Sequence, residues 1–247
     1  MSCNWRVMDI ETINAFITAI NAGDTDRLKR LIEKGIDINR TIVDQGSIKT
    51  LNCSVDFSSA DTPLNIAVKK QDVELVRFLL SQESIDPNKE GKKNNTPLMN
   101  SILGYKYGYG HTGYKDGYPH QQSLSCNASE WNSVENIEII KMLLQHPRID
   151  PNLNNPLKAL AFADHNTQEY NTYVLHSWWS KCKYKLKVAQ LLLAHLKINV
   201  NVQDEFDGCT PLFYASRAGF YDLVKCLLNH NATNINLKNN IDVDDEW

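Results

Sequence analysis

The amino-acid sequence predicts an all-α solenoid, in which similar pairs of helices are stacked side by side. Three observations predict this fold class. A helix–turn–helix pattern recurs along the chain, the copies are evenly spaced where they can be compared, and each copy has an apolar face too small to be buried alone. With 247 residues, 42% of them hydrophobic, the chain is long enough for one such stack.

The most regular copy begins at Thr210 and ends at Asn236. A threonine is a good N-cap, and Pro211 suits the first turn of a helix, where a missing N–H costs nothing. Ala218-Gly219 forms a tight turn before a second helix. That helix carries two adjacent apolar ridges on one face, at Leu223, Val224, Leu227 and Leu228.

The same start recurs as Thr62-Pro63-Leu64, as Thr96-Pro97-Leu98 and, altered, as Asn155-Pro156-Leu157. Thr96 follows Thr62 by 34 residues, close to the period of roughly 33 residues of one repeat family. In start, turn, ridge and period together, the chain resembles the ankyrin repeats. The resemblance implies an ankyrin-repeat solenoid of helix–turn–helix units joined by short hairpins.

We expect five units in one domain, the first of them atypical because a terminal repeat has one face in water. A connection of about twenty residues, 40–61, follows this first unit and is either an elongated hairpin or a loop. The asparagines that close the units are interpreted as turn residues that tolerate a left-handed backbone. The predicted units span residues 10–39, 62–88, 96–152, 155–201 and 208–239, with an acidic tail at 241–247.

Two long inserts interrupt the pattern, at residues 104–133 of the third unit and 165–185 of the fourth. Each insert joins the first helix of its unit to the second. Because neighbouring units stack nearly in register, both inserts should leave from the same edge, about 10 Å apart. Their aromatic content argues against plain disorder, since disordered segments are poor in aromatic residues.

The aromatic residues of the inserts are the candidate partner-binding site, because Tyr and Trp dominate interface hot spots. Two other interpretations stay open: the rings fold back over the edge of the solenoid as a satellite core, or they line a small-ligand pocket. The candidate residues are Tyr105, Tyr107, Tyr109, Tyr114, Tyr118, Trp131, Tyr170, Tyr173, Trp178 and Trp179.

No arrangement in the sequence specifies a metal or a catalytic centre. The histidines and cysteines in or beside the inserts have neither helix-face nor zinc-knuckle spacing, and nothing fixes a base beside a thiol. We therefore expect no cofactor, no metal and no catalytic residue. The residues weighed for these roles are His111, His120, Cys126, His165, His176 and Cys182.

The charge balance argues against a general nucleic-acid binder, since the formal net charge is −3. The exception is an alternating strip of lysines that would meet an acidic protein, a phosphoinositide or RNA, or would simply be a solvated face. The strip consists of Lys181, Lys183, Lys185 and Lys187.

The scattered cysteines, six in all, suit a reducing compartment, and the first residues lack the apolar segment of a signal peptide. No apolar run approaches the roughly 18 residues of a membrane span. We expect a cytoplasmic monomer. Stand-alone ankyrin modules with irregular inserts resemble proteins that intracellular bacteria and large viruses deploy inside host cells, which implies an effector acting on host proteins.

The resemblance implies a non-catalytic scaffold that captures a partner protein through a concave surface of hairpin tips and first helices, or through the inserts. The alternative is a small-ligand or catalytic site built by the inserts. One feature departs from the family pattern. The His that usually follows Thr-Pro-Leu is replaced, so its hydrogen bonds between neighbouring units must be lost or made otherwise; its place is held by Asn65, Met99, Lys158 and Phe213.

Overall fold

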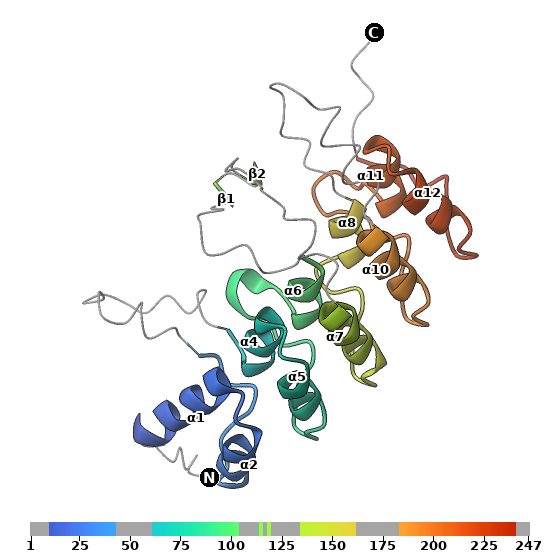
Figure 1. The fold of residues 1–247 in the computed structure, drawn as a ribbon. Helices are drawn as coiled ribbons and strands as arrows, with labels where there is room; N and C mark the ends of the chain where they lie inside the picture. The colour runs from blue at the N-terminus through green and yellow to red at the C-terminus, as the bar shows by residue number, and fades with distance from the viewer. Residues whose placement is uncertain are drawn as a thin grey trace, which may run out of the picture.

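The protein is a stack of paired helices in a computed structural model that describes residues 10–42, 61–103, 114–115, 118–119, 134–161 and 183–240 (Figure 1). The first helices of the pairs form one row and the second helices another. The all-α solenoid is thereby confirmed. The pairs are α1 (Ile10–Ala22) with α2 (Thr25–Glu33), α4 (Pro63–Lys70) with α5 (Val73–Leu80), α6 (Pro97–Leu103) with α7 (Val134–Gln145), α8 (Pro156–Ala161) with α10 (Lys183–Leu193), and α11 (Pro211–Arg217) with α12 (Tyr221–Leu228).

Short elements accompany the helices. A 3-10 turn, η2 (Lys92–Asn94), precedes α6. Two short strands, β1 (Tyr114–Lys115) and β2 (Tyr118–Pro119), pair in antiparallel fashion inside the first insert. The ends of the long connection also meet, because the N–H groups of Ile42 and Asp61 each donate to the other's carbonyl, at 2.7 and 3.1 Å.

The helices begin where their caps require. The hydroxyl oxygens of Thr62 and Thr210 accept the N–H groups of Asn65 and Phe213, and a proline occupies the first turn in both helices. Aspartate caps two of the second helices: Asp72 accepts the N–H of Leu75, and Asp24 serves α2 in the same way. Short polar side chains thus cap these four helices, whereas α12 begins after Phe220 without a side-chain cap.

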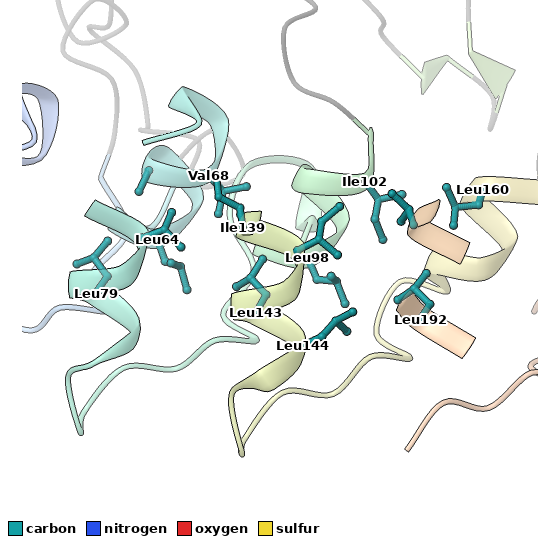
Figure 2. Close-up of a cluster of buried hydrophobic side chains, with 14 of the residues drawn as sticks. Leu64, Val68, Leu79, Leu98, Ile102, Ile139, Leu143, Leu144, Leu160 and Leu192 are labelled. Atoms are coloured by element: carbon teal, nitrogen blue, oxygen red, sulfur yellow. The ribbon is translucent and has the colours of Figure 1, made fainter. Parts of the chain in front are cut away.

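The core lies between the two rows of helices, where the apolar ridges of one unit pack against those of the next (Figure 2). In that view Leu64, Leu79 and Val68 of one unit approach the ridge of the following unit. This burial is the main force that holds the stack together. The first three ridge positions of the central units are buried, and the fourth is half-buried at Leu80 and Leu193; the buried residues are Leu75, Val76, Leu79, Ile139, Ile140, Leu143, Val188, Ala189 and Leu192.

The asparagines that close the units do not adopt a left-handed backbone, so that interpretation is wrong. Among the described residues, positive φ angles of non-glycine residues occur at Gln71, Asn94, Asn154 and Asn155 instead. An asparagine side chain offers both a donor and an acceptor. In this fold the closing asparagines use both groups to join one unit to the next.

The bridge between the first two units shows the pattern. Asn39 donates through Nδ2 to the carbonyl of Ser84 and accepts at Oδ1 from the N–H of Asp86, both at 2.7 Å. We call the recurring set of such bridges the asparagine ladder. Its further members are Asn88 with Arg148 and Asp150, Asn152 with Lys197 and Asn199, and Asn201 with Ala232 and Asn234.

Three histidines support the ladder. His146 accepts at Nδ1 the N–H of Arg148, the residue whose carbonyl receives a ladder bond from Asn88. His195 and His230 make the same contact to the residue two positions on. A nitrogen that accepts a hydrogen bond is unprotonated, so the contact of His146 requires its neutral imidazole.

The second insert is shorter than predicted at its C-terminal end. Residues 183–185, assigned to the insert 165–185 from the sequence, form the first turn of α10. The run Lys-Tyr-Lys there contains no Gly or Pro that would stop a helix from starting before the ridge. The remaining parts of both inserts and the acidic tail lie outside the described residues. Within those residues, no helix is long and apolar enough to cross a membrane.

Candidate functional site

The aromatic residues predicted to bind a partner lie mainly outside the described part of the chain. Tyr114 and Tyr118 are placed by their backbone alone, on β1 and β2, where Tyr114 pairs with Pro119 and Tyr118 with Lys115. The other residues fall outside the described ranges. These are Tyr105, Tyr107, Tyr109, Trp131, Tyr170, Tyr173, Trp178 and Trp179.

The helices that bound the two inserts are neighbours in the stack. Helix α6, which ends at Leu103, packs against α8, which ends at Ala161. Helices α7 and α10, which resume after the inserts, also pack against each other (Figure 1). The points where the chain leaves the solenoid are therefore on adjacent units.

The lysine strip does not form a continuous charged surface. A helical backbone turns side chains two positions apart to different faces, and α10 begins at Lys183. Lys185 is only 5% exposed, whereas Lys187 is exposed. The two lysines whose side chains are described are thus divided between the interior and the solvent; Lys181 lies outside the described residues.

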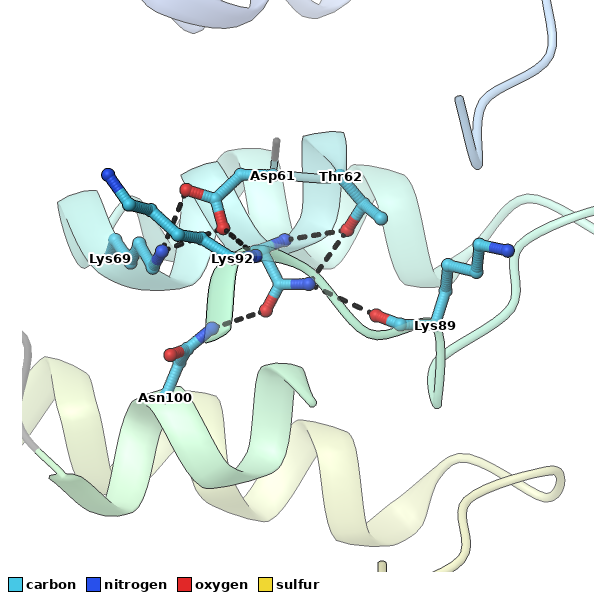
Figure 3. A network of polar contacts seen from close by, with 7 residues as sticks. Asp61, Thr62, Lys69, Lys89, Lys92 and Asn100 are labelled. Atoms are coloured by element: carbon cyan, nitrogen blue, oxygen red, sulfur yellow. Dashed lines mark hydrogen bonds and ion pairs between the residues drawn. The ribbon is translucent and has the colours of Figure 1, made fainter. Parts of the chain in front are cut away.

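A polar network joins the second and third units at their first helices (Figure 3). The buried carboxylate of Asp61 forms an ion pair with Lys69 at 2.7 Å and also accepts the backbone N–H of Lys92 at 3.0 Å. Burial strengthens such a pair and makes loss of either partner costly. The network fixes the hairpin at Lys92 against α4.

Asn65, at the position of the missing family histidine, hydrogen-bonds within its own unit and to the next one. Its Nδ2 donates to the hydroxyl of Thr62 and to the carbonyl of Lys89, both at 3.0 Å, and its Oδ1 accepts from Nδ2 of Asn100 in the next unit (Figure 3). The sequence left two outcomes open, that the hydrogen bonds of the missing histidine are lost or that they are made by another group. At this junction another group, the amide of Asn65, makes the hydrogen bond to the next unit. Both amides are fully buried.

A second polar network joins the fourth and fifth units. Lys158, which also replaces the family histidine, forms an ion pair with Asp204 of the hairpin that precedes α11. Its Nζ lies 5.2 Å from the ring centroid of Tyr214 in α11. The hydroxyl of Tyr214 donates to Asp207 at 2.7 Å. One hairpin is thus tied to the helices on either side of it.

Electrostatics follow from this burial. Burial is the largest cause that lowers the pKa of Lys158, with the nearby Asp207 carboxylate opposing it. For Asp207, burial alone would raise the pKa, but the hydrogen bonds from Tyr214 and Cys209 outweigh it and the pKa is lowered. Burial and the Asp207 contact raise the pKa of Tyr214. Asp207 therefore stays ionised and Tyr214 protonated near neutral pH.

The turn between these two aspartates presents Phe206, which is 91% exposed. Its N–H donates to Asp204 at 2.9 Å, and Asp207 follows it directly. The N–H groups of Gly208 and Cys209 close the turn by donating to the carbonyl of Asp204 and to the carboxylate of Asp207. The large apolar ring of Phe206 is thus exposed to solvent on a hairpin that is hydrogen-bonded on both sides of it.

Sequence reasoning singled out neither Phe206 nor the two aspartates. Their signal is local: Asp204 and Asp207 stand on either side of a phenylalanine in a predicted hairpin, where apolar residues are uncommon. Tyr214 lies seven positions after its partner Asp207, whereas Lys158 is 46 positions from Asp204 and meets it only when the units are stacked. No group of three or more His, Cys, Asp or Glu suited to a metal occurs among the described residues.

Comparison with known protein families gives two matches. A model described as ankyrin repeats (3 copies) matches residues 127–239. A model described as ankyrin repeats (many copies) matches residues 16–80. Comparison with curated proteins gives no significant match.

Proposed function

Because the chain belongs to the ankyrin repeat family, we propose that it is a non-catalytic scaffold that captures a partner protein through the Phe206 hairpin and the aromatic inserts. Ankyrin repeats generally mediate protein–protein interaction and are typically non-catalytic. The observation that carries the proposal is Phe206, because a rigid, exposed ring needs little ordering when it enters a pocket on a partner.

The hairpin supports this role through its two anchors. Lys158 and Tyr214 hold Asp204 and Asp207, which fix the backbone on both sides of the ring. Since the hydrogen bonds of the turn already hold its backbone, binding through Phe206 costs less ordering of the loop than it would for a free segment. A single exposed apolar residue is common on protein surfaces, and what distinguishes Phe206 is this fixation.

The inserts extend the proposed surface. Their bases are on adjacent units, so aromatic residues from both inserts are available to one partner. We propose Tyr105, Tyr107, Tyr109, Tyr114, Tyr118, Trp131, Tyr170, Tyr173, Trp178 and Trp179 as the contributing residues. The scattered cysteines fit a cytoplasmic site of action, and the likeness to host-directed ankyrin modules favours action on host proteins.

The test begins with isolation of the partner that the intact protein retains, followed by titration calorimetry with the purified pair. Phe206→Ala should weaken binding by about tenfold or more, the range of an interface hot spot. Leu196→Ala is the matched control, because Leu196 is 102% exposed in the turn that follows α10, outside the hairpin, and its loss should leave the affinity unchanged.

The inserts are tested separately with Trp178→Ala combined with Trp179→Ala. Weaker binding in this variant together with an effect of Phe206→Ala supports one composite surface. If both variants bind as tightly as the unmodified protein while folding normally, the proposed surface is wrong.

A further inference from the structure

The C-terminal end of the stack carries an unused half of the junction that joins all other units. Asn236 occupies the turn that Asn39, Asn88, Asn152 and Asn201 occupy. In each of these turns the asparagine N–H donates to the side chain two positions earlier, here to Asn234 at 3.0 Å. The structure describes no hydrogen bond from the side-chain amide of Asn236.

The apolar surface at this end is open as well. Ile235 is 66% exposed. The residue at its position is buried in each of the other four units, as Ile38, Pro87, Pro151 and Val200. Leu228 and Tyr221 of α12 are also exposed. The turn that the next unit covers at every internal junction is therefore uncovered here.

The N-terminal unit offers the other half of the junction. The ladder asparagine of one unit binds a carbonyl and an N–H two residues apart in the next. In the first unit these groups are the carbonyl of Gly35 and the N–H of Asp37, and neither has a hydrogen bond among the described residues. Among the described residues, the C-terminal end of the stack thus has a side-chain amide with no carbonyl and N–H to bind. The N-terminal end has the matching carbonyl and N–H with no amide bound to them.

Charges at the two ends also match. Between the second and third units, Arg77 forms an ion pair with Glu138 at 2.6 Å. The position of Arg77 is held by Lys225 in the last unit, and that of Glu138 by Asp26 in the first. Both of these residues are exposed. Stacking the last unit of one molecule on the first unit of another would bring opposite charges together.

We propose that the C-terminal face, formed by Tyr221, Leu228, Ile235 and Asn236, docks the N-terminal unit of a second copy of this chain. The amide of Asn236 then bridges Gly35 and Asp37 of the second copy and completes the ladder. Because this contact joins different surfaces, each added copy leaves a new face open and the assembly does not close at a dimer. This inference does not depend on the proposed partner protein and replaces the monomer expected from the sequence.

The experiment is sedimentation equilibrium of the full chain at total concentrations from about 1 to 200 µM, a range that reports micromolar association. The average mass should rise with concentration and show no plateau at the dimer. Ile235→Asp should weaken the association at least tenfold. Leu196→Asp, which places the same charge on an exposed leucine outside the face (102% exposed, against 66% for Ile235), should change it less than twofold.

A charge exchange tests the direction of stacking. Lys225→Asp and Asp26→Lys should each weaken association, and a chain carrying both substitutions should recover it, because each docked pair again has opposite charges. Circular dichroism confirms that every variant remains folded.

Three outcomes overturn the proposal. The first is an unmodified protein that stays monomeric over the whole range. The second is association that Ile235→Asp does not weaken or that the double exchange does not recover. The third is a chain ending at residue 240 that associates where the full chain does not, which would make residues 241–247 the occupant of the face.

Discussion

At the scale of single residues, two chemically different side chains at the position after Pro-Leu each form a bond to the next unit. Asn65 meets the next unit through its amide, and Lys158 meets the following hairpin through its ammonium group. Both bonds cross between units, although the two residue types share little chemistry. In these two units the position therefore carries a polar side chain that reaches the next unit, whereas Met99 and Phe213 occupy it in the other two.

Replacing Asn65 by alanine should destabilise the fold by about 1–3 kcal/mol, because the carbonyl of Lys89 and the buried amide of Asn100 lose their partner. Urea unfolding followed by circular dichroism measures this loss. Asn231→Ala is the control, since Asn231 is exposed and has no described side-chain bond. Equal stability of the two variants would contradict the role given to Asn65.

His146 gives the fold a pH dependence of known sign. Burial, with a smaller effect of Arg148, lowers the pKa of His146 below its ordinary value of about 6.5. The unfolded chain then binds the proton more readily, so the stabilisation is complete above about pH 6.5 and is lost as the pH falls through and below that value. Unfolding free energies at pH 7.5 and 5.5 should differ less in His146→Asn; an unchanged difference would exclude this residue as the source.

At the scale of the elements, the loops after the second helices join the units as regularly as the helices pack. Asn152 forms its bridge to Lys197 and Asn199, and the equivalent Asn236 has no described bridge. Two residues with the same local turn therefore differ in their contacts to the neighbouring unit.

This difference predicts unequal effects of the same substitution. Asn152→Ala should cost about 1–2 kcal/mol, the net value of two hydrogen bonds. Asn236→Ala should change the stability by less than about 0.5 kcal/mol, as for an exposed surface site. Urea unfolding at about 1 µM, where docking between copies does not contribute, makes the comparison. A loss at Asn236 as large as that at Asn152 would mean that its amide has a partner within the molecule.

The elements themselves were largely predictable from the sequence. Thr62 and Thr210 mark helix starts through local hydrogen bonds, and the ridge of Leu223 and Leu227 marks a buried face through its period. The ladder was not predictable in this way. A local turn accounts for the closing asparagines as well as a bridge does, and the carbonyl of Ser84, 45 positions from Asn39, appears only after stacking.

The candidate site was less predictable than the fold. Aromatic content pointed to the inserts, most of whose residues lie outside the described part of the chain. Lys185 was expected in a surface strip but is buried in α10. The sequence did not single out Phe206, because its fixed position depends on Lys158 of α8 and Tyr214 of α11. These two residues bind the aspartates on either side of Phe206. Local sequence patterns predict helices, whereas a site formed between units depends on how the units are stacked.

At the scale of the whole molecule, the solenoid should fold without its first insert. Helices α6 and α7 pack together as α4 and α5 do, although 30 residues separate α6 from α7 and two separate α4 from α5. Replacing residues 104–133 by Gly-Asp, which joins α1 to α2, should therefore leave a cooperative fold with the same helices.

The result also separates two roles of the insert. If the insert serves a partner, the shortened chain should be as stable as the full chain or more stable by about 2 kcal/mol, because a shorter loop costs less entropy to close. Thermal unfolding measures the change. A loss of several kcal/mol would instead show that the aromatic rings cover the edge of the solenoid as a satellite core.

The asparagine ladder has a mechanical consequence. Its bonds lie after the C-terminal ends of the second helices, whereas the inserts join the chain at the N-terminal ends of α7 and α10. A helix of 12 residues is about 18 Å long, so α7 acts as a lever of that length between the two edges. If the loops keep their spacing, a rotation of about 5° at one junction moves the insert edge by about 1.5 Å. Bending of the stack would thus pivot on the amide bonds and change the separation of the two insert bases most.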